Sequence, residues 1–495
     1  MFVATSKQMK AYDQALLNEG YQIEELVDKA SDKILPHCLN YNRIVVVCGP
    51  GNNGADGISL AIKLHIRSRA VKVYCFGNPE KFSKANNFYL QQAQEMEVPI
   101  TIMALEDLKA FESDIRWADL IVDAMFGFGL NSPVRGMAKT LVDLINEQNN
   151  AEVIAIDIPT GLSPDKGVPL GSVIKAHKTV TLTSIKQGFL NDECHQYTGE
   201  IAVELLQAKD LRQELKLAKL VSPLWVKNHL KQRDYYGYKG TYGKILHLTG
   251  CNHYRGAALL ASKAAVYTGS GIVCVCSTDK VIDALTVMTP ECTSMIRPER
   301  LTIEIFDNYN AILIGSGLGL NSQSEQYLID VLTNAKCPIV IDGDGLTLLA
   351  KHLDLLKSVT VPVILTPHVG EFKRLCPVSD ELDMVEKATQ FALEYQVIMV
   401  LKGPNTLISD GIHVYRNITG NKAMATAGMG DVLAGIISSF LGQGYQAIDS
   451  AILGVYLHGT CGDELEDHNY TVIPSELIKL IPEAMQVILN ENSSK

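Results

Sequence analysis

The stretch Met424-Ala-Thr-Ala-Gly-Met-Gly-Asp-Val-Leu-Ala-Gly435 joins a glycine-rich turn directly to an apolar helical pattern. Gly428 and Gly430 carry no Cβ, so the backbone can approach a ligand closely there. The free amides at the start of the predicted helix, together with the helix dipole, favour an anion such as phosphate. Asp431 stands at the same place, where a carboxylate repels phosphate but can accept the proton of a hydroxyl that attacks phosphorus. The stretch therefore predicts a phosphoryl-transfer site, although a plain glycine turn capped by Asp431 would have the same sequence.

The composition indicates a folded protein with more than one domain. A chain of 495 residues is too long for one ordinary core, and 47% hydrophobic and 20% charged residues are typical of soluble proteins. The net charge of −11 argues against nucleic acid as a partner, and we expect neither a signal peptide nor a membrane span. The 11 cysteines are scattered and form no C-x-x-C pair, so we expect reduced thiols in a cytoplasmic protein rather than a zinc site.

The first half alternates short apolar runs with helical patterns. Arg43-Ile-Val-Val-Val-Cys48 predicts a buried parallel strand, and Gly49-Pro-Gly-Asn-Asn-Gly-Ala-Asp-Gly57 follows it as a loop before a helix at 58–65. One or two amphipathic helices are expected between residues 4 and 30. Further strands are expected at 71–76, 120–123, 153–156 and 178–183. This alternation predicts a doubly wound, Rossmann-like α/β domain.

Three of these strands are followed by polar residues with oxygen-bearing side chains, namely Asn53, Asp123 and Thr160. Ligands of open α/β sheets bind at the carboxyl ends of the strands, so the three loops should converge at one edge. A carboxylate, an amide oxygen and a hydroxyl together suit a hard cation. Asn, Gly and Asp are also common in plain turns, so a purely structural role for these loops stays open.

Two charged residues near the same edge have two interpretations each. Asp157, in Asp157-Ile-Pro-Thr-Gly161, is either an acid/base or a helix cap. Lys186 either neutralises a phosphate or is simply solvated.

The second half repeats the strand-then-glycine plan, which predicts a second doubly wound α/β domain. Apolar runs at 245–248, 271–276, 311–314, 338–341, 363–365 and 398–401 each lead into a glycine or polar cluster. His368 follows one of these strands and either hydrogen-bonds a substrate or caps a helix. Lys402 and Thr406 follow the next strand, where a cation and a hydroxyl suit a nucleotide phosphate. Residues 205–230 look helical, and we expect the domain boundary between residues 210 and 220.

The motifs in this order resemble those of a known family. Residues 1–212, with Gly-Pro-Gly-Asn-Asn-Gly-Ala-Asp-Gly, Asp123-Ala-Met-Phe-Gly-Phe-Gly and Asp157-Ile-Pro-Thr-Gly, resemble the NAD(P)HX epimerase domain. Residues 213–495 resemble the ribokinase-like, ADP-dependent NAD(P)HX dehydratase domain. Their matching motifs are His-Tyr-Arg-Gly-Ala-Ala, Gly-Ser-Gly-Leu-Gly, Thr-Pro-His-Val-Gly-Glu, Leu-Lys-Gly-Pro-Asn-Thr and Gly-Met-Gly-Asp. The resemblance covers nearly the whole chain and implies repair of hydrated nicotinamide cofactors.

The resemblance also implies site residues, motif by motif. The epimerase substrate would contact Asn52, Asn53, Gly54, Ala55, Asp56, Gly127, Phe128, Gly129, Leu130, Asn131, Ser132, Pro133 and Asp157. Potassium would be held by Asn53, Asp123 and Thr160. The dehydratase substrate would contact Ala257, Gly317, His368 and Asp431, and the adenine nucleotide Lys402, Gly403, Pro404, Asn405, Thr406 and Gly430. ADP, magnesium and potassium are the expected cofactors, and a homo-oligomer is the expected assembly.

The sequence departs from the family pattern at three places. Thr426-Ala427-Gly428 stands where the family often has Thr-Gly-Gly, Leu26-Val-Asp-Lys-Ala-Ser31 where it has Leu-Met-Glu-x-Ala-Gly, and Thr160 where Ser is common. Two other classes of function stay open: a small-molecule kinase, which shares the Gly-x-Gly-Asp logic, and a non-catalytic metabolite-binding or protein-interaction role for the first half.

Overall fold

The computed structural model describes residues 1–378 and 384–490, which fall into two compact units, Met1–Leu217 and Ala218–Lys495. Both are α/β units with mainly parallel sheets, as predicted. No helix within the described ranges is long and apolar enough to cross a membrane. Each of the eleven cysteines, all of which lie in those ranges, is free.

The first unit is built on a seven-stranded parallel sheet of order β4-β3-β2-β5-β6-β7-β9. The strands of the unit are β1 (Phe2–Ala4), β2 (Arg43–Cys48), β3 (Ala70–Cys75), β4 (Ile100–Ile102), β5 (Leu120–Ala124), β6 (Glu152–Ile156), β7 (Lys178–Leu182), β8 (Ile185–Lys186) and β9 (Glu200–Glu204). The short strands β1 and β8 lie outside this sheet and pair with each other. Its helices are α1 (Ser6–Asn18), α2 (Ile23–Ile34), α3 (Asn52–Ile66), α4 (Lys84–Glu95), α5 (Leu108–Trp117), α6 (Gly136–Glu147) and α7 (His195–Thr198).

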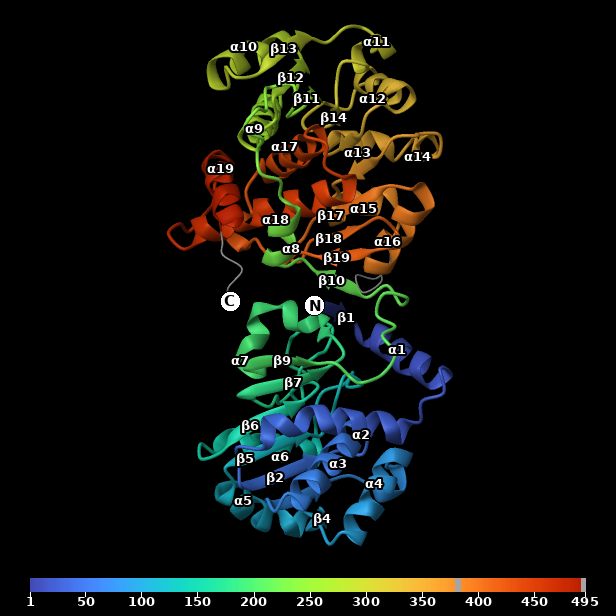
Figure 1. Ribbon diagram of the computed structural model, residues 1–495, viewed down its shortest axis with the longest axis vertical. Helices are drawn as coiled ribbons and strands as arrows, with labels where there is room; N and C mark the ends of the chain where they lie inside the picture. Colours follow the sequence, from blue (N-terminus) through green and yellow to red (C-terminus); the bar gives the residue numbers. More distant parts are fainter. Residues whose placement is uncertain (379–383, 491–495) are drawn as a thin grey trace. The chain divides into compact units, whose positions relative to one another are not determined.

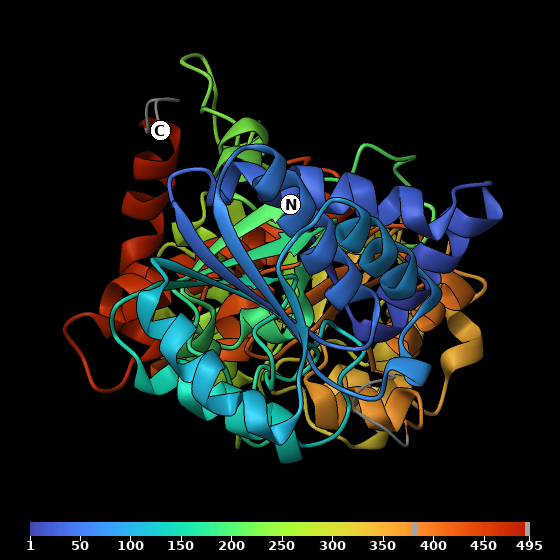
Figure 2. The same cartoon turned by 90° about the horizontal axis from the view of Figure 1, so that it is seen from below.

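Alternation along the central strands explains why both faces of this sheet are covered. In β2, Val46 joins the core formed with α2, α3 and α4, whereas Val45 and Val47 join the core formed with α5 and α6. Figure 2 shows α5 and α6, in cyan, on the opposite side of this sheet from the darker blue α2 and α3. The chain adds β3 and β4 on one side of β2 and β5 on the other, so strand order reverses between β2 and β5. This reversal is where open α/β sheets bind ligands.

The second unit has the strand order β13-β12-β11-β14-β15-β16-β17-β18-β19-β10, parallel except for the β17-β18-β19 meander. Its strands are β10 (Ala218–Leu220), β11 (Lys244–Leu248), β12 (Ile272–Ser277), β13 (Thr293–Ile296), β14 (Ala311–Ile314), β15 (Ile339–Ile341), β16 (Val363–Leu365), β17 (Ile398–Leu401), β18 (Leu407–Ser409) and β19 (Val414–Arg416). Its helices are α8 (Pro223–His229), α9 (Arg255–Tyr267), α10 (Asp279–Met288), α11 (Ile303–Phe306), α12 (Ser322–Asn334), α13 (Asp344–Leu349), α14 (Leu353–Leu356), α15 (Val369–Leu375), α16 (Met384–Tyr395), α17 (Met429–Gly442), α18 (Ala447–Glu466) and α19 (Pro474–Asn490).

Helix α17, which begins in the opening stretch, lies at the centre of the second unit. Every residue from Val432 to Gly442 is buried, in a core shared with α9, α18, α19 and the sheet. At Gly435 a Cβ would lie 2.1 Å from the carbonyl oxygen of Ala261 in α9, so glycine sets how closely the two helices pack. Figure 1 shows α9 and α19 to the left of the strands and α12 and α14 to the right. Strand order reverses between β11 and β14, which marks the second ligand-binding edge.

Two expectations about elements were wrong. Helix α3 begins at Asn52, six residues before the predicted start, so the Asn-Asn-Gly-Ala-Asp run lies in its first turns. Its glycines serve close packing, since a Cβ at Gly54 would lie 2.0 Å from the carbonyl oxygen of Gly49. Residues 205–230 are not one helix, because they contain β10 and only the short α8. Ser222 caps α8 and Pro223 occupies its first turn.

Candidate functional sites

The catalytic candidate of the second unit, Asp431, lies in the first turn of α17. Gly428 caps this helix with φ +98°, a left-handed backbone conformation that favours glycine. Burial raises the pKa of Asp431 to about 7, and the nearby Asp342 carboxylate adds to the rise, against the opposing charge of Lys402. A carboxyl group that titrates near neutral pH suits proton transfer.

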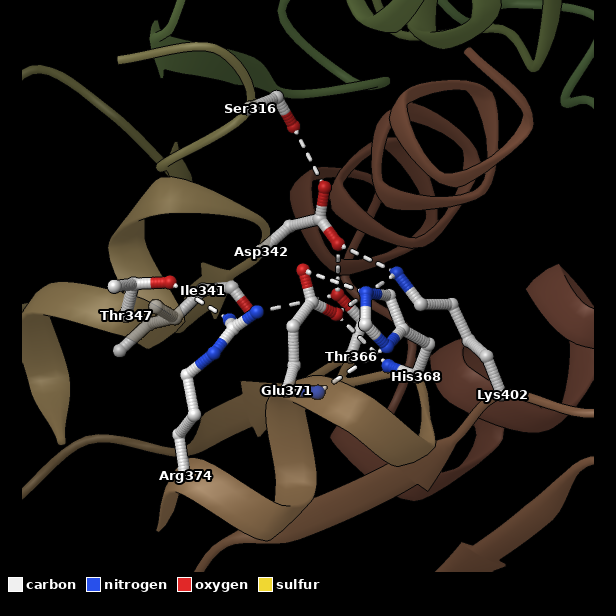
Figure 3. Close-up of polar contacts among 9 residues, drawn as sticks. All are labelled: Ser316, Ile341, Asp342, Thr347, Thr366, His368, Glu371, Arg374 and Lys402. Carbon is white, nitrogen blue, oxygen red and sulfur yellow. Dashed lines mark hydrogen bonds and ion pairs between the residues drawn. The ribbon is translucent and has the colours of Figure 1, made fainter. Parts of the chain in front are cut away.

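Asp342, just after β15, joins several of the surrounding polar side chains (Figure 3). It is buried, and it accepts hydrogen bonds from Ser316 Oγ at 3.0 Å, Thr366 Oγ1 at 2.8 Å and Lys402 Nζ at 3.0 Å. We did not predict this residue as part of the site. Its position at a strand end, in Ile-Asp-Gly-Asp-Gly, was the signal that could have identified it.

Lys402 supplies a positive charge at the edge of the second unit's sheet where Asp342 lies. Its ammonium pairs with Asp342 and lies 3.8 Å from Glu371 Oε2. Burial alone would lower the pKa of Lys402, but the two carboxylates outweigh it and raise the pKa above its ordinary value. A Cβ at Gly430 would lie 3.2 Å from Lys402 Nζ, so the lysine reaches the start of α17. The structure thus brings the predicted residues Lys402, Gly430 and Asp431 together.

His368 shows the capping role that the sequence left open. Its Nδ1 accepts a hydrogen bond from the Glu371 amide at 3.1 Å, and the Glu371 carboxylate accepts one from the His368 amide at 2.8 Å. This is a reciprocal capping box at the start of α15. With Nδ1 accepting, a neutral ring carries its proton on Nε2, which remains able to donate to a ligand from a half-exposed side chain. Capping and substrate contact are therefore compatible here.

The remaining predicted residues of this unit follow β11, β14 and β17. Gly317 has φ +62°, and a Cβ there would lie 2.8 Å from the Cβ of Ala257, so these two predicted residues lie side by side. In the loop Lys402, Gly403, Pro404, Asn405 and Thr406, the Thr406 hydroxyl donates to the Gly403 carbonyl at 3.0 Å. Lys402 and His368 form a parallel β-bridge, which holds this loop beside the start of α15.

In the first unit, Asp123 and Thr160 form a buried polar pair. Asp123 accepts from the Thr160 amide at 2.7 Å, the Thr160 hydroxyl at 2.8 Å and the Met125 amide at 3.1 Å. Burial nevertheless raises the pKa of Asp123 to about 6, against these hydrogen bonds. Asn53 lies by the neighbouring loop, since a Cβ at Gly127 would be 3.5 Å from its Oδ1. Its buried Nδ2 has no hydrogen-bond partner within the described residues.

Asp157 and Lys186 form a buried ion pair, so Lys186 is not solvated and Asp157 is not a simple helix cap. Lys186 Nζ lies 2.6 Å from Asp157 Oδ1, and the two side chains are 0% and 7% exposed. The ammonium also donates to Thr181 Oγ1 at 3.0 Å and to the Leu182 carbonyl at 3.1 Å. Asp157 itself adopts φ +67°, a strained backbone conformation of the kind that clusters at functional sites.

A cavity of about 470 Å³ brings the loops of the first unit together. The predicted residues that line it are Asn52, Asn53, Asp56, Gly127, Phe128, Gly129, Leu130, Asn131 and Asp157. Gly54 and Ala55 are buried in α3, and Ser132 and Pro133 are exposed beyond the cavity lining. The cavity is also lined by Asp13 of α1, a residue that we did not single out from the sequence. Burial raises the pKa of Asp56 well above its usual range, with Asp157 and Asp13 adding to the rise.

Comparisons with known proteins agree with this two-unit arrangement. Residues 245–483 match the family model described as NAD(P)H-hydrate dehydratase, and residues 16–188 match that of the YjeF-related protein N-terminus. The chain is 32% identical to the bifunctional NAD(P)H-hydrate repair enzyme Nnr of Moorella thermoacetica, over 94% of this chain and 92% of that protein. It is 31% identical to the Vibrio cholerae protein of the same name, over 93% and 92%.

Two solved structures resemble the second unit. An ADP/ATP-dependent NAD(P)H-hydrate dehydratase from Bacillus subtilis, co-crystallised with ATP and Mg²⁺, is 32% identical with a TM-score of 0.50, and it matches 55% of this chain and 99% of its own. A ribokinase-like superfamily protein from Enterococcus faecalis V583 is 29% identical with a TM-score of 0.51, over 55% and 97%. The chain belongs to the family of bifunctional NAD(P)H-hydrate repair enzymes.

Proposed function

We propose that the first unit interconverts the R and S epimers of NAD(P)HX, and that the second dehydrates the S epimer to NAD(P)H at the expense of ADP. The products of the second reaction are AMP and phosphate. The observation that carries this proposal is the grouping of Asp431, Lys402 and the start of α17, where a proton acceptor lies beside a cation and free helix amides. That combination suits phosphoryl transfer to a hydroxyl.

The chemistry follows from the poor leaving ability of hydroxide. Asp431 accepts the proton of the ring hydroxyl as its oxygen attacks the terminal phosphorus of ADP, and AMP leaves. The lone pair of the ring nitrogen then expels phosphate from the carbon, and loss of a proton restores the reduced ring. Lys402 and the amides that follow Gly428 stabilise the negative charge on the transferring phosphoryl group.

The adenine nucleotide is assigned to Lys402, Gly403, Pro404, Asn405, Thr406 and Gly430. The site tolerates close approach by a phosphate because Gly430 places only backbone beside the ammonium of Lys402. Ala257, Gly317, His368 and Asp431 are assigned to NAD(P)HX. Magnesium would accompany the nucleotide phosphates, as is usual for this ion.

Potassium fits the first unit at Asn53, Asp123 and Thr160. Asp123 is a fully buried carboxylate whose hydrogen bonds do not offset its desolvation, so a bound cation would stabilise its charge. The side-chain oxygen of Asn53, which lies beside the loop at Gly127, is the kind of ligand that a hard cation binds. Bound potassium would supply a fixed positive charge at this edge of the sheet.

Asp157, which pairs with Lys186, is the acid/base candidate for epimerisation.

The decisive experiment incubates the full chain with a mixture of NADHX epimers, ADP, magnesium and potassium. We expect both epimers to be consumed, the absorbance of the reduced nicotinamide to return fully, and AMP and inorganic phosphate to accumulate. Without ADP, the epimers should interconvert and nothing more. A stable phosphorylated product without recovery of NADH would instead identify a kinase, and consumption of one epimer alone would remove the epimerase assignment.

A further inference from the structure

The carboxyl group of Asp13 faces the cavity of the first unit from a helix outside the sheet. Met9, Asp13 and Leu17, spaced four residues apart, form one stripe of α1, and all three line the cavity with Asp157 and Asp56. A carboxyl group within an apolar stripe loses hydration, which costs free energy unless a partner compensates. Among the described residues Asp13 has no hydrogen-bond or ion-pair partner, so no structural contact explains why a carboxyl group stands at this position.

The placement of α1 is fixed by contacts with the strand that carries Lys186. Strand β1 pairs in parallel with β8, with Ala4 opposite Lys186, and α1 begins two residues later behind a Thr5 capping box. Ser184 contacts the sulfur of Met9 at 3.2 Å. At the next turn, the buried Tyr12 donates its hydroxyl proton to the Lys209 carbonyl at 3.1 Å. These contacts hold Asp13 near the Asp157–Lys186 pair.

We infer that Asp13 is a second acid/base of the epimerase, working opposite Asp157 in the inversion of the hydroxyl-bearing carbon. This inference rests on the proposed epimerase function. Inversion by loss and return of water needs one group that protonates the departing hydroxyl and one that deprotonates the incoming water. The cavity places carboxyl groups in two electrostatic settings: Lys186 pairs directly with Asp157 but acts on Asp13 only through space.

The step balances as follows in one direction. Asp13 gives its proton to the hydroxyl oxygen, the C–O bond breaks, water leaves, and the ring nitrogen's lone pair forms a C=N bond. A water molecule then attacks the same carbon from the opposite face, the C=N electrons return to nitrogen, and Asp157 takes the surplus proton. In the reverse direction the two carboxyl groups exchange roles, and solvent returns the proton between turnovers.

Both directions therefore require one proton on the pair. Burial, together with the charge of Asp157, raises the pKa of Asp13 to about 7, with Lys186 opposing. Asp56 and Asp157 are the charged groups that line the cavity with it, and the buried Lys186 acts on it from behind Asp157. Above that pH Asp13 is ionised and cannot protonate the departing hydroxyl, so kcat/KM for epimerisation should fall as pH rises through about 7.

The test measures epimer interconversion by the full chain without ADP, from pH 5.5 to 9 in about half-unit steps, for wild type and Asp13→Asn. We expect Asp13→Asn to lower kcat/KM by about 100-fold or more and to remove the fall above neutral pH. Dehydration of purified S epimer should be unchanged. Asp28→Asn is the matched control, since that carboxylate pairs with Lys63 on α3 and does not line the cavity.

The proposed epimerase function and the role of Asp13 fail on different results. Wild type without epimerisation would remove the proposed function, whereas active wild type with an Asp13→Asn rate within threefold of it would overturn the role of Asp13. Should Asp13→Asn fail to fold, the wild-type profile decides: a fall above neutral pH supports the inference, and a flat rate up to pH 9 overturns it.

Discussion

The two units bury their reactive carboxyl groups at the carboxyl edge of a doubly wound sheet, but they use their lysines differently. In the first unit Lys186 pairs directly with the catalytic candidate Asp157, at 2.6 Å. In the second, Lys402 pairs with a neighbour, Asp342, at 3.0 Å, and the pKa of Asp431 rises to about 7. In the first unit the buried cation therefore contacts the catalytic candidate itself. In the second it contacts a neighbouring carboxylate, and burial leaves Asp431 able to exchange a proton near neutral pH.

The largest effect is expected at Asp431, where a substitution should abolish dehydration and leave epimerisation intact. Asp431→Asn keeps the size of the side chain but removes the proton acceptor, so dehydration should fall by about 100-fold to 10,000-fold while epimerisation is unchanged. The two rates are measured on the same preparation, with ADP for the first and without it for the second. Asp279→Asn, in the first turn of α10, is the control for an Asp at a helix start. A variant that still dehydrates at a tenth of the wild-type rate would show that Asp431 is not the base.

The next largest effect is expected at Asp157. It shows whether the Asp157–Lys186 pair serves catalysis or only the stability of the first unit. Asp157→Asn should lower epimerisation by about 100-fold, and it leaves a buried ammonium without its partner, at a cost of about 3–5 kcal/mol in the free energy of unfolding. Lys186→Met added to Asp157→Asn should recover most of that stability but not the activity. Urea unfolding and epimerisation are measured for both variants. Activity that returns together with stability would reduce Asp157 to a structural residue.

A smaller effect contrasts the two units by pH. Asp431 must be ionised to accept a proton, so kcat/KM for dehydration should fall as pH drops below about 7, roughly tenfold per pH unit. Epimerisation should instead fall as pH rises above about 7, where Asp13 becomes ionised. Both profiles are measured on one sample between pH 5.5 and 9. Parallel profiles would contradict the opposite protonation states that the two reactions require of Asp13 and Asp431.

The smallest effect concerns packing rather than chemistry. Gly435→Ala would place a methyl group 2.1 Å from the Ala261 carbonyl oxygen and should lower the unfolding free energy of the second unit by about 1–3 kcal/mol. Gly256→Ala, on α9 with nothing within 4 Å, should be neutral or slightly stabilising. Thermal unfolding measures both, and epimerisation should be unaffected. Equal stability of the two variants would show that α9 and α17 can move apart.

Much of the fold was predictable because buried strands and glycine turns leave strong local patterns. The strand Arg43–Cys48 was predicted with its observed bounds, and the fold class of both units is confirmed. The start of α3 was misplaced because its glycines resemble a loop in sequence, although they serve close packing against the sheet. His368 was left open, since a histidine after a strand has the same sequence whether it caps a helix or faces a ligand.

The sequence by itself determined the alternating α/β pattern, the order of motifs, and the placing of Asp123, Asp157, Lys402 and Asp431 at strand or helix ends. Those features depend on neighbours along the chain. Only the tertiary structure decided that Lys186 neutralises Asp157, that Asp342 holds Lys402, and that α1 turns Asp13 toward the cavity. These contacts join residues distant in sequence, and burial sets their charge, so no local pattern specifies them.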